Sequence, residues 1–575
     1  MESVPTHVGG PPPHANGGPP PGALTNGGPP PWATNGAGGP PSGVNGSGPP
    51  PWATNGAGGP PPGVNGSGPP PWATGGGPPP FLATGPPLPI PSFPTDPSLP
   101  TILILCTSST APGHVLPLTA IARHLRSLGY AVTFVGGVHH RNLIESSGAS
   151  FLPTHESISL AKGPFRQWGM ERAKYAEGLP RMVQDFKTFF IGQIEGQFLS
   201  TKSALEELRK DGGPGGSSDD PNETKKNKEV IVINETMWFG YLPYKYGAPR
   251  PRGWEDDEAM PRTLGINVTP IMLDGDGFPP FPLGLLPSEN PEARERDKVL
   301  KEWLYRYVVK EAYDGFRENI KKCGGAEVPD EWMVNLSYTA HDTTLQLCDP
   351  ALEYPRPDLP EHVKFAGSLP PKKGAPPGFV FPAWWRADVL GNGGKRSVVV
   401  VSQGTLARDY SMLLAPTVRA LAGREDVLVI ALLGKQGLEV PPEVLPPPEE
   451  GVDVSNVRVA DFIPYDSVLE FADVMISNAG YGGFIHCVVN GVPLIAAGLS
   501  EDKCEVSARV EWTGAGINLR TGRPSPEAVA TAVDTILSSG GKYRDRAREL
   551  AVQVAKGNPL QVVEREIRAL TKGHI

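Results

Sequence analysis

The chain has 575 residues, which is enough for more than one domain, and its formal net charge of −9 argues against binding to nucleic acid or to an anionic membrane surface. Its five cysteines form no CxxC pair and no metal-ligand spacing, so we expect reduced thiols and a cytoplasmic location. No apolar run reaches the length of about 18 residues that predicts a transmembrane segment.

Residues 1–99 are a Pro/Gly-rich tail that contains a repeat. The sequence of residues 28–47 recurs almost unchanged at 48–67, and more than half of the first 100 residues are Pro or Gly. Such a segment buries too little apolar surface to offset its ordering entropy, so we expect disorder. The PPPW clusters at Trp32, Trp52 and Trp72 are candidate polyproline motifs for a partner's aromatic groove; a spacer without a partner is the commoner alternative.

Ordered structure is predicted to begin with a strand–helix–strand unit. TILILC (101–106) and AVTFVGG (131–137) are continuous apolar runs, typical of strands buried on both faces. Between them lies a stretch with apolar residues at helical spacing that ends at Gly129, which together predicts a parallel βαβ unit. Further on, EVIVIN (229–234) predicts a strand and residues 293–321 predict a charged amphipathic helix.

A second series of alternating elements follows a Pro-rich segment. Buried strands are predicted at 397–404, 427–434, 456–464, 473–480 and 491–498, with helices between them. We therefore predict an α/β protein with two facing Rossmann-like domains, which bind a ligand between the carboxyl ends of their strands. The predicted parts are an N-terminal domain at 100–365, a linker at 366–396, a C-terminal domain at 397–550 and a final helical segment at 551–575.

The segment SNAGYGG (477–483) lies between a predicted strand and a predicted helix, where backbone N–H groups and the helix dipole bind phosphate. A Gly-rich turn alone is a weak signal, but three further segments stand around it: FIPYDSVL (462–469), EDKCEVSARV (501–510) and GAGINL (514–519). From about Val457 to Leu519 the chain resembles the donor-binding signature of the UDP-glycosyltransferase family, a GT-B-type superfamily. The resemblance implies an acceptor-binding N-terminal domain, a UDP-sugar-binding C-terminal domain and a last helix that returns to the first domain.

The resemblance also implies a donor site. In the family an aromatic residue stacks on uracil, which implies Phe462 here, and an early Ser or Thr touches the β-phosphate, which implies Ser402 and Thr405. The diphosphate is held by the Gly-rich turn and the sugar hydroxyls by the acidic turn. These two turns supply Asn478, Gly480, Gly482 and Gly483, and Glu501, Asp502 and Lys503.

The chain departs from the family pattern in three places, which leaves the identity of the sugar open. Asn478 stands where His usually opens the Gly-rich turn, and an amide donates a hydrogen bond but carries no charge. His486 stands where a Glu usually binds the ribose hydroxyls, and its alternative is a core or surface histidine. Lys503 replaces the usual Gln and is either a ligand or a solvated lysine.

His114 is the candidate general base. It lies in GHVLP, at the start of the first helix, and this position matches the catalytic-histidine motif of the family. We expect the helix dipole to disfavour the imidazolium and to keep a neutral ring that can accept the proton of an acceptor hydroxyl. The family orients this histidine with an Asp; here the strand EVIVIN leads into Glu235, our candidate, with Asn234 beside it as the alternative.

Aromatic residues in two loops are candidates for an apolar acceptor pocket, and core packing is the alternative for each. They are Phe278 and Phe281 in the Pro-rich loop, and Trp238, Phe239 and Tyr241 after the EVIVIN strand. We expect inverting transfer of a hexosyl group from a UDP-sugar to a hydroxyl of a small lipophilic acceptor such as a sterol, a phenolic or another secondary metabolite. No metal and no further cofactor is implied, because no Asp-x-Asp cluster or His/Cys set stands at a cleft position.

Three alternatives stay open at this point. Two are enzymes on the same frame, a transferase for a lipid-linked sugar and a UDP-sugar epimerase. The third is a catalytically impaired nucleotide-sugar-binding protein, which the departures at Asn478, His486 and Lys503 would fit. His114 discriminates, since a transferase that no longer catalyses has little reason to keep it.

Overall fold

In this computed structural model, the structure describes residues 90–571 apart from 108–112, 160–170, 173, 177, 211–227, 256, 373, 377 and 406. The predicted tail up to residue 89, with its repeat and its PPPW clusters, lies outside these residues. No helix in the described ranges is both long and apolar enough to span a membrane.

The N-terminal domain is built on a parallel sheet of seven strands in the order β3-β2-β1-β4-β5-β6-β7. The first strand, β1, is buried along its whole length, because its apolar side chains alternate between two covered faces. The strands are β1 (Thr101–Leu105), β2 (Ala131–Gly136), β3 (Ser150–Pro153), β4 (Val230–Glu235), β5 (Arg262–Asn267), β6 (Thr343–Gln346) and β7 (Val363–Phe365).

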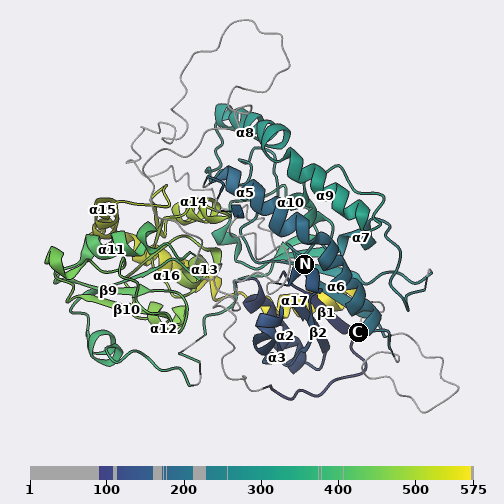
Figure 1. The fold of residues 1–575 in the computed structure, drawn as a ribbon, viewed down its shortest axis with the longest axis horizontal. Helices are drawn as coiled ribbons and strands as arrows, with labels where there is room; N and C mark the ends of the chain where they lie inside the picture. Colours follow the sequence, from purple (N-terminus) through teal and green to yellow (C-terminus); the bar gives the residue numbers. More distant parts are fainter. Residues whose placement is uncertain are drawn as a thin grey trace, which may run out of the picture. The chain divides into compact units, whose positions relative to one another are not determined.

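The described part of the N-terminal domain also contains helices, several of which pack on this sheet (Figure 1). They are α2 (Val115–Ser127), α3 (Arg141–Glu145), α5 (Leu179–Asp185), α6 (Ile194–Glu207), α7 (Leu242–Lys245), α8 (Pro291–Trp303), α9 (Lys310–Lys322) and α10 (Met333–Thr339). The helix predicted at 293–321 is two helices, α8 and α9, with a π-helical turn at Leu304–Val308 between them.

The C-terminal domain is built on a parallel sheet of six strands in the order β10-β9-β8-β11-β12-β13. They are β8 (Ser397–Ser402), β9 (Val427–Leu432), β10 (Val457–Ala460), β11 (Val474–Ser477), β12 (Leu494–Ala496) and β13 (Gly516–Asn518). Val398 and Val400 of β8 enter one hydrophobic core, and Val399 and Val401 enter the core on the other face. The predicted fold class, two doubly wound α/β domains, is therefore confirmed.

The helices of this domain follow the same alternation. They are α11 (Leu414–Leu421), α12 (Tyr465–Leu469), α13 (Tyr481–Val489), α14 (Lys503–Thr513), α15 (Pro526–Leu537) and α16 (Lys542–Val554). The last helix, α17 (Pro559–Leu570), packs elsewhere. Its Val563 and Ile567 are fully buried in a core of the N-terminal domain, where α17 contacts α2 and β5. Figure 1 shows α17 in yellow among the dark elements of the first sheet.

Two segments pack more closely than their composition suggests. The Phe93 carbonyl accepts a hydrogen bond of 2.8 Å from Arg126 Nη2, and Asp96 N donates to the Gly129 carbonyl at 2.9 Å. The predicted tail boundary at residue 99 therefore falls inside a segment that contacts α2. In the predicted linker, Trp385 and Val389 are buried in a core of the C-terminal domain.

Candidate active site

His114 and Glu235 meet at the carboxyl edge of the first sheet. His114 immediately precedes α2, and Glu235 is the last residue of β4, the strand beside β1. His114 Nδ1 lies 3.1 Å from Glu235 Oε1. The carboxyl group is fully buried and the His114 side chain is 24% exposed, so the ring keeps one edge open to an incoming molecule.

Strand alternation separates Glu235 from Asn234. Asn234 Nδ2 donates to the Glu235 carbonyl at 2.8 Å and to the Trp238 carbonyl at 3.0 Å, and it lies 3.4 Å from His341 Nε2. Successive side chains of a strand point to opposite faces, so only one of the two neighbours can reach His114. Glu235 is the one that contacts it.

The charge of Glu235 governs the protonation of His114. Burial opposes the charged ring, but the contacting Glu235 carboxylate, aided by the charge of Asp502, outweighs burial and raises the pKa of His114. Burial likewise favours a neutral Glu235, but His114 outweighs it and lowers the pKa of Glu235. Glu235 therefore acts against the neutral ring that the N-terminus of α2 was expected to favour, because a carboxylate in contact stabilises the imidazolium.

The Gly-rich turn joins β11 to α13. Asn478 Nδ2 donates a hydrogen bond of 2.7 Å to the Gln403 carbonyl, which ties the turn to the loop after β8. Gly480 is the N-cap of α13, and Gly482 and Gly483 lie in its first turn. The free N–H groups of a helix N-terminus point out of this turn, an arrangement that binds phosphate.

The glycines of this turn border open space. A Cβ at Gly480 or Gly482 would meet no atom within 4 Å, and one at Gly483 would make only ordinary contacts at 3.9 Å and beyond. Internal packing therefore does not require glycine at 480 and 482, whereas a close approach of backbone to a ligand does. Ala479 in the same turn has a positive φ of 58°, and Glu501 in the acidic turn one of 52°; strained backbone of this kind concentrates at functional sites.

The two candidates after β8 differ in exposure. Ser402 is fully buried, and its Oγ accepts hydrogen bonds from Tyr465 Oη at 2.9 Å and from the Gly404 N–H at 3.2 Å. Thr405 is exposed, in the loop that faces Asn478. Of the two hydroxyls, that of Thr405 is therefore the accessible one.

The two candidates for the nucleoside, Phe462 and His486, have different surroundings. Phe462 is partly buried in the loop between β10 and α12. His486 Nδ1 lies 2.6 Å from Asp466 Oδ1, and its side chain is 41% exposed. Asn490 Nδ2 donates to the same oxygen at 3.0 Å. His486 is thus neither a core histidine nor a free surface one, because a carboxylate fixes its ring.

The acidic turn places two carboxylates in different settings. Glu501 forms ion pairs with Lys503 and with Arg172 of the N-terminal domain, and Ser500 Oγ donates to it at 2.5 Å. Burial opposes its charge, but Lys503 and Arg172 outweigh burial and lower the pKa of Glu501 to about 2. Asp502 forms no hydrogen bond with any described side chain, and burial raises its pKa. Asp502 is therefore the acidic group of this turn that is available to a ligand.

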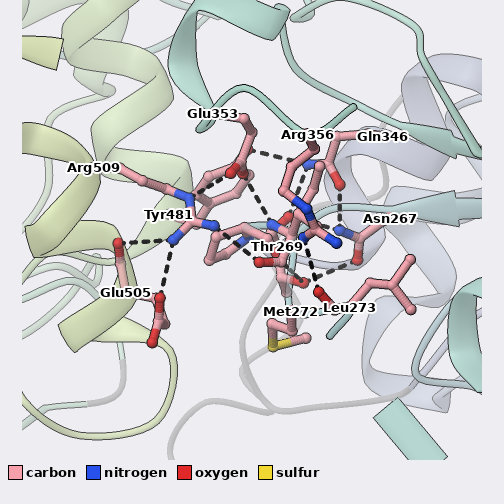
Figure 2. A network of polar contacts seen from close by, with 12 residues as sticks. Asn267, Thr269, Met272, Leu273, Gln346, Glu353, Arg356, Tyr481, Glu505 and Arg509 are labelled. Atoms are coloured by element: carbon pink, nitrogen blue, oxygen red, sulfur yellow. Dashed lines mark hydrogen bonds and ion pairs between the residues drawn. The ribbon is translucent and has the colours of Figure 1, made fainter. Parts of the chain in front are cut away.

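A buried ion cluster connects α14 to the N-terminal domain (Figure 2). Arg509 Nε donates to Glu353 Oε2 at 2.6 Å, its Nη1 donates to Glu505 Oε2 at 3.1 Å, and its Nη2 donates to the Ile271 carbonyl at 2.9 Å. Figure 2 shows Arg509 reaching from the pale green helix to Glu353 on the teal chain. The cluster fixes the helix after the acidic turn against the loop after β5.

A second contact joins the Gly-rich turn to the same domain. Gln346, the last residue of β6, donates through Nε2 to Tyr481 Oη at 3.2 Å and to the Thr269 carbonyl at 2.9 Å. Tyr481 directly follows Gly480 and begins α13. The carboxyl edge of the first sheet thus contacts both helices that carry candidate donor residues.

The structure divides the candidate acceptor residues into two groups. Trp238, Phe239 and Tyr241 are each 1% exposed, and Trp238 Nε1 donates to Thr201 Oγ1 at 3.0 Å. They are core residues, which corrects the reading of them as pocket lining. Phe278 and Phe281 are partly buried and line a small cavity beside Arg509, together with Ile271, Met272 and Leu273.

Three residues of this region were not predicted from the sequence. Asp466 stands in the quoted segment FIPYDSVL, where a carboxyl group two residues after Pro464 was the available signal. Arg172 and Arg509 carry no signal, because their partners, Glu501 and Glu353, are distant in the sequence and lie in the other domain.

Comparisons with known proteins show which family and which fold this chain resembles. The family model described as erythromycin biosynthesis protein CIII-like, C-terminal domain, matches residues 449–569. UDP-glucosyltransferase 1 of Beauveria bassiana (strain ARSEF 2860) is 36% identical over 468 residues, covering 81% of this chain and 94% of that one. UDP-glucosyltransferase A1 of Starmerella bombicola is 30% identical over 470 residues, covering 81% and 92%. Among solved structures, the glycotransferase of kitacinnamycin shares the fold with a TM-score of 0.55 at 18% identity, covering 82% of this chain and 99% of that one.

Proposed function

Since the chain belongs to the UDP-glycosyltransferase family, we propose that it transfers a hexosyl group from a UDP-sugar to a hydroxyl of a small lipophilic acceptor, with inversion at the anomeric carbon. Sugar transfer from a UDP-sugar is supported by relatives that are named UDP-glucosyltransferases, and these names favour glucose as the sugar. The observation that carries the proposal is the contact of His114 with Glu235 near Asp502 of the other domain.

His114 is the proposed general base. With Nδ1 engaged by Glu235, Nε2 is the ring atom left for a substrate hydroxyl. As the hydroxyl oxygen attacks the anomeric carbon, its proton passes to Nε2, and the imidazolium that forms is stabilised by the buried Glu235 carboxylate. Glu235 is therefore a positioning residue that also supports the charged ring.

The N-terminus of α13 is the proposed site of the leaving diphosphate. The bond between the anomeric carbon and the β-phosphate oxygen breaks, and its electron pair leaves with UDP. Backbone N–H groups at Gly480, Gly482 and Gly483 can donate to phosphate oxygens there, and the helix dipole favours the negative charge. Attack and departure on opposite sides of one carbon give the inverted product.

The lipophilic acceptor is inferred from the cavity at the domain junction. Phe278, Phe281, Ile271, Met272 and Leu273 present apolar side chains to it. The opposite part of the cavity is lined by charged residues, among them Glu353, Glu505 and Arg509. The apolar side suits the hydrophobic part of an alcohol or phenol. The cysteines all lack disulfide partners, which fits the cytoplasmic location that we propose.

The alternative of a nucleotide-sugar-binding protein without catalysis is less favoured. The structure keeps His114 and a buried carboxylate in contact, although Asn478, His486 and Lys503 depart from the family pattern. In a protein that only binds nucleotide sugar, the contact of buried Glu235 with the partly exposed His114 would bring no benefit. Burying the two groups costs solvation energy.

Turnover assays with purified protein test the proposal. The protein is incubated with UDP-glucose, UDP-galactose or UDP-glucuronic acid and a panel of sterols, phenols and long-chain alcohols. We expect a glycoside of defined mass and release of UDP, with NMR of the product showing the β-anomer from an α-linked donor. Binding of UDP without turnover on any acceptor would favour the binding protein, and an α-linked product would overturn inversion.

A further inference from the structure

The connection between the two domains contacts the region proposed to bind the nucleoside. We call residues 378–390 the strap. Within the strap, Phe379 packs against Phe462, with ring centroids 6.3 Å apart and planes at 71°. Phe462 is the residue that the family resemblance places on the uracil. Phe379 of the strap therefore packs against the ring that is proposed to stack on the base.

The strap is fixed in place by its other aromatic residues. The ring centroids of Phe379 and Phe381 are 5.0 Å apart. Phe381 in turn stacks on Trp385, with ring centroids 4.5 Å apart and planes at 22°. Trp385 is 5% exposed in a core of the C-terminal domain and contacts Phe471 edge to face at 5.7 Å. This chain of rings anchors Phe379, whereas its neighbour Val380 is 86% exposed.

The same connection reaches the ribose end of the proposed nucleoside site. The backbone N–H of Lys372, shortly before the strap, donates to Asp466 Oδ2 at 2.7 Å. The other oxygen of Asp466 lies 2.6 Å from His486 Nδ1 and accepts from Asn490. One carboxylate thus links the interdomain connection to the histidine that stands where the family uses a glutamate.

We propose that Phe379 and Asp466 are positioning residues of the uridine subsite, so that the interdomain connection forms part of the nucleotide site. This inference rests on the proposed function. Phe379 holds Phe462 at the angle that lets its ring stack on the base. Asp466 accepts the Nδ1–H of His486, which leaves Nε2 as the acceptor for a ribose hydroxyl, the bond that a glutamate carboxylate would otherwise accept.

Calorimetry with UDP and with inorganic pyrophosphate tests the proposed role of Phe379. Phe379→Ala should weaken UDP binding about threefold to tenfold, the range that one aromatic pair contributes, and should leave pyrophosphate binding unchanged. Phe379→Leu keeps apolar volume without the ring and should weaken UDP in the same way. Val380→Ala is the matched control on the exposed neighbour and should bind both ligands as the wild type does.

Comparing the binding of UDP with that of 2′-deoxy-UDP tests the proposed role of Asp466. Asn at position 466 has one acceptor oxygen for the three N–H groups that the Asp466 carboxylate now serves. Asp466→Asn should therefore reduce the preference for UDP over 2′-deoxy-UDP, whereas Phe379→Ala should keep that preference. A fold defect would weaken the binding of both ligands by the same factor and would leave the ratio of their Kd values unchanged.

The outcomes separate the inference from the function on which it rests. Wild-type protein that binds UDP, together with Phe379→Ala and Phe379→Leu proteins that bind it equally well, overturns the role of Phe379 and leaves the proposed function standing. An unchanged deoxy preference in Asp466→Asn overturns the role of Asp466. Wild-type protein that binds no UDP overturns the proposed function and the inference together.

Discussion

His114 contacts the carboxylate of Glu235 in its own domain and is also influenced by the charge of Asp502 in the other domain. Both negative charges favour the imidazolium and raise the pKa of His114, although burial opposes them. A base with a raised pKa accepts a proton more strongly, but a smaller fraction of it is neutral near pH 7. The active fraction should therefore grow as pH rises through the pKa of His114.

This charge balance predicts the pH dependence of turnover. The acid limb of kcat/KM should have an apparent pKa above the usual histidine value of about 6.5, because Glu235 outweighs burial. Glu235→Gln should move the limb to lower pH, since burial then acts without the opposing carboxylate, and should lower turnover less than His114→Ala. His114→Ala should lower turnover about 10²–10⁴-fold and abolish the limb. Steady-state rates from pH 5 to 9 measure the position of the acid limb and the loss of turnover in each variant.

Nucleotide binding is the control for these variants. UDP affinity should hardly change in His114→Ala, because the ring faces the proposed acceptor and the diphosphate belongs at α13. A His114→Ala protein with near-normal turnover, or one that keeps the acid limb, would assign the proton transfer to another group.

The open space in front of α13 gives a second prediction. Gly482→Val should weaken UDP binding at least tenfold, a loss of about 1.4 kcal/mol, because the side chain enters space that phosphate must occupy. Gly482→Ala adds a smaller group and should give an intermediate loss. Calorimetry measures affinity, and urea unfolding serves as the control, since no atom within 4 Å resists a Cβ there. Undiminished affinity in Gly482→Val would place the nucleotide elsewhere.

A functional residue could be predicted from the sequence where it lies in a local motif. His114 and the Gly-rich turn could be proposed because their spacing to predicted strands and helices is local. Glu235 could be chosen over Asn234 only as a candidate, because the choice depends on which face of β4 each side chain occupies. Asp466 and Arg172 act through contacts with other loops, which no local pattern records.

Elements with continuous apolar runs were predictable, and those with mixed composition were not. β1, β2, β4, β8, β9, β11 and β12 were placed by such runs, and β10 was placed although Arg458 interrupts its apolar residues. β7 was not, because VKF is only three residues long and its Lys364 is exposed. β5 and β6 were not either, because RTLGIN and TTLQ carry polar side chains at buried positions. Those polar groups are satisfied internally: Asn267 Nδ2, for example, donates to Gln346 Oε1 at 2.6 Å. Hydrogen bonding between neighbouring strands replaces the apolar signal.

The segment before β1 gives a prediction about truncation. Deleting residues 1–89 should leave the unfolding midpoint unchanged and turnover within about twofold, because this Pro/Gly-rich sequence has too little apolar content to build a core. Deleting residues 1–96 also removes Phe93 and Thr95, which accept hydrogen bonds from Arg126, and should cost about 1–3 kcal/mol. Urea unfolding of the two truncations compares them directly. Equal stability would mean that the contacts of Phe93 and Thr95 do not matter.

At the scale of the whole molecule, the domains are joined by contacts between residues far apart in the sequence. Arg509 and Glu353 are 156 positions apart, and Gln346 and Tyr481 are 135 positions apart. The sequence could predict two Rossmann-like domains but not this junction, because a buried ion pair leaves no periodic pattern. Figure 2 shows that the junction lies between α14 and the loop after β5. The geometry of the proposed site therefore depends on a cluster of three buried charges.

The charge state of this cluster is sensitive to pH. Burial raises the pKa values of Glu353 and Glu505, and Arg509 only partly opposes the effect. A carboxyl group whose pKa is raised on folding contributes stability below its unfolded pKa and loses it as pH rises through the folded pKa. Arg509 is what makes the two ionised carboxylates tolerable at neutral pH, since it is only 2% exposed and contacts both.

Arg509→Met should therefore destabilise the protein by about 3–5 kcal/mol at pH 7, the cost of leaving a buried charge without its partner. Lowering the pH toward 5 should reduce this loss of stability. In Arg509→Met no cation balances the charges of Glu353 and Glu505, and protonation removes those charges. Adding Glu353→Gln and Glu505→Gln to Arg509→Met should restore most of the stability at pH 7, since each Gln oxygen can still accept from the Ile271 or Gly284 N–H. Urea unfolding of the wild type, the single variant and the triple variant at pH 5 and pH 7 measures these differences. A loss in Arg509→Met that is the same at both pH values and persists in the triple variant would mean that Arg509 acts through packing and not through charge.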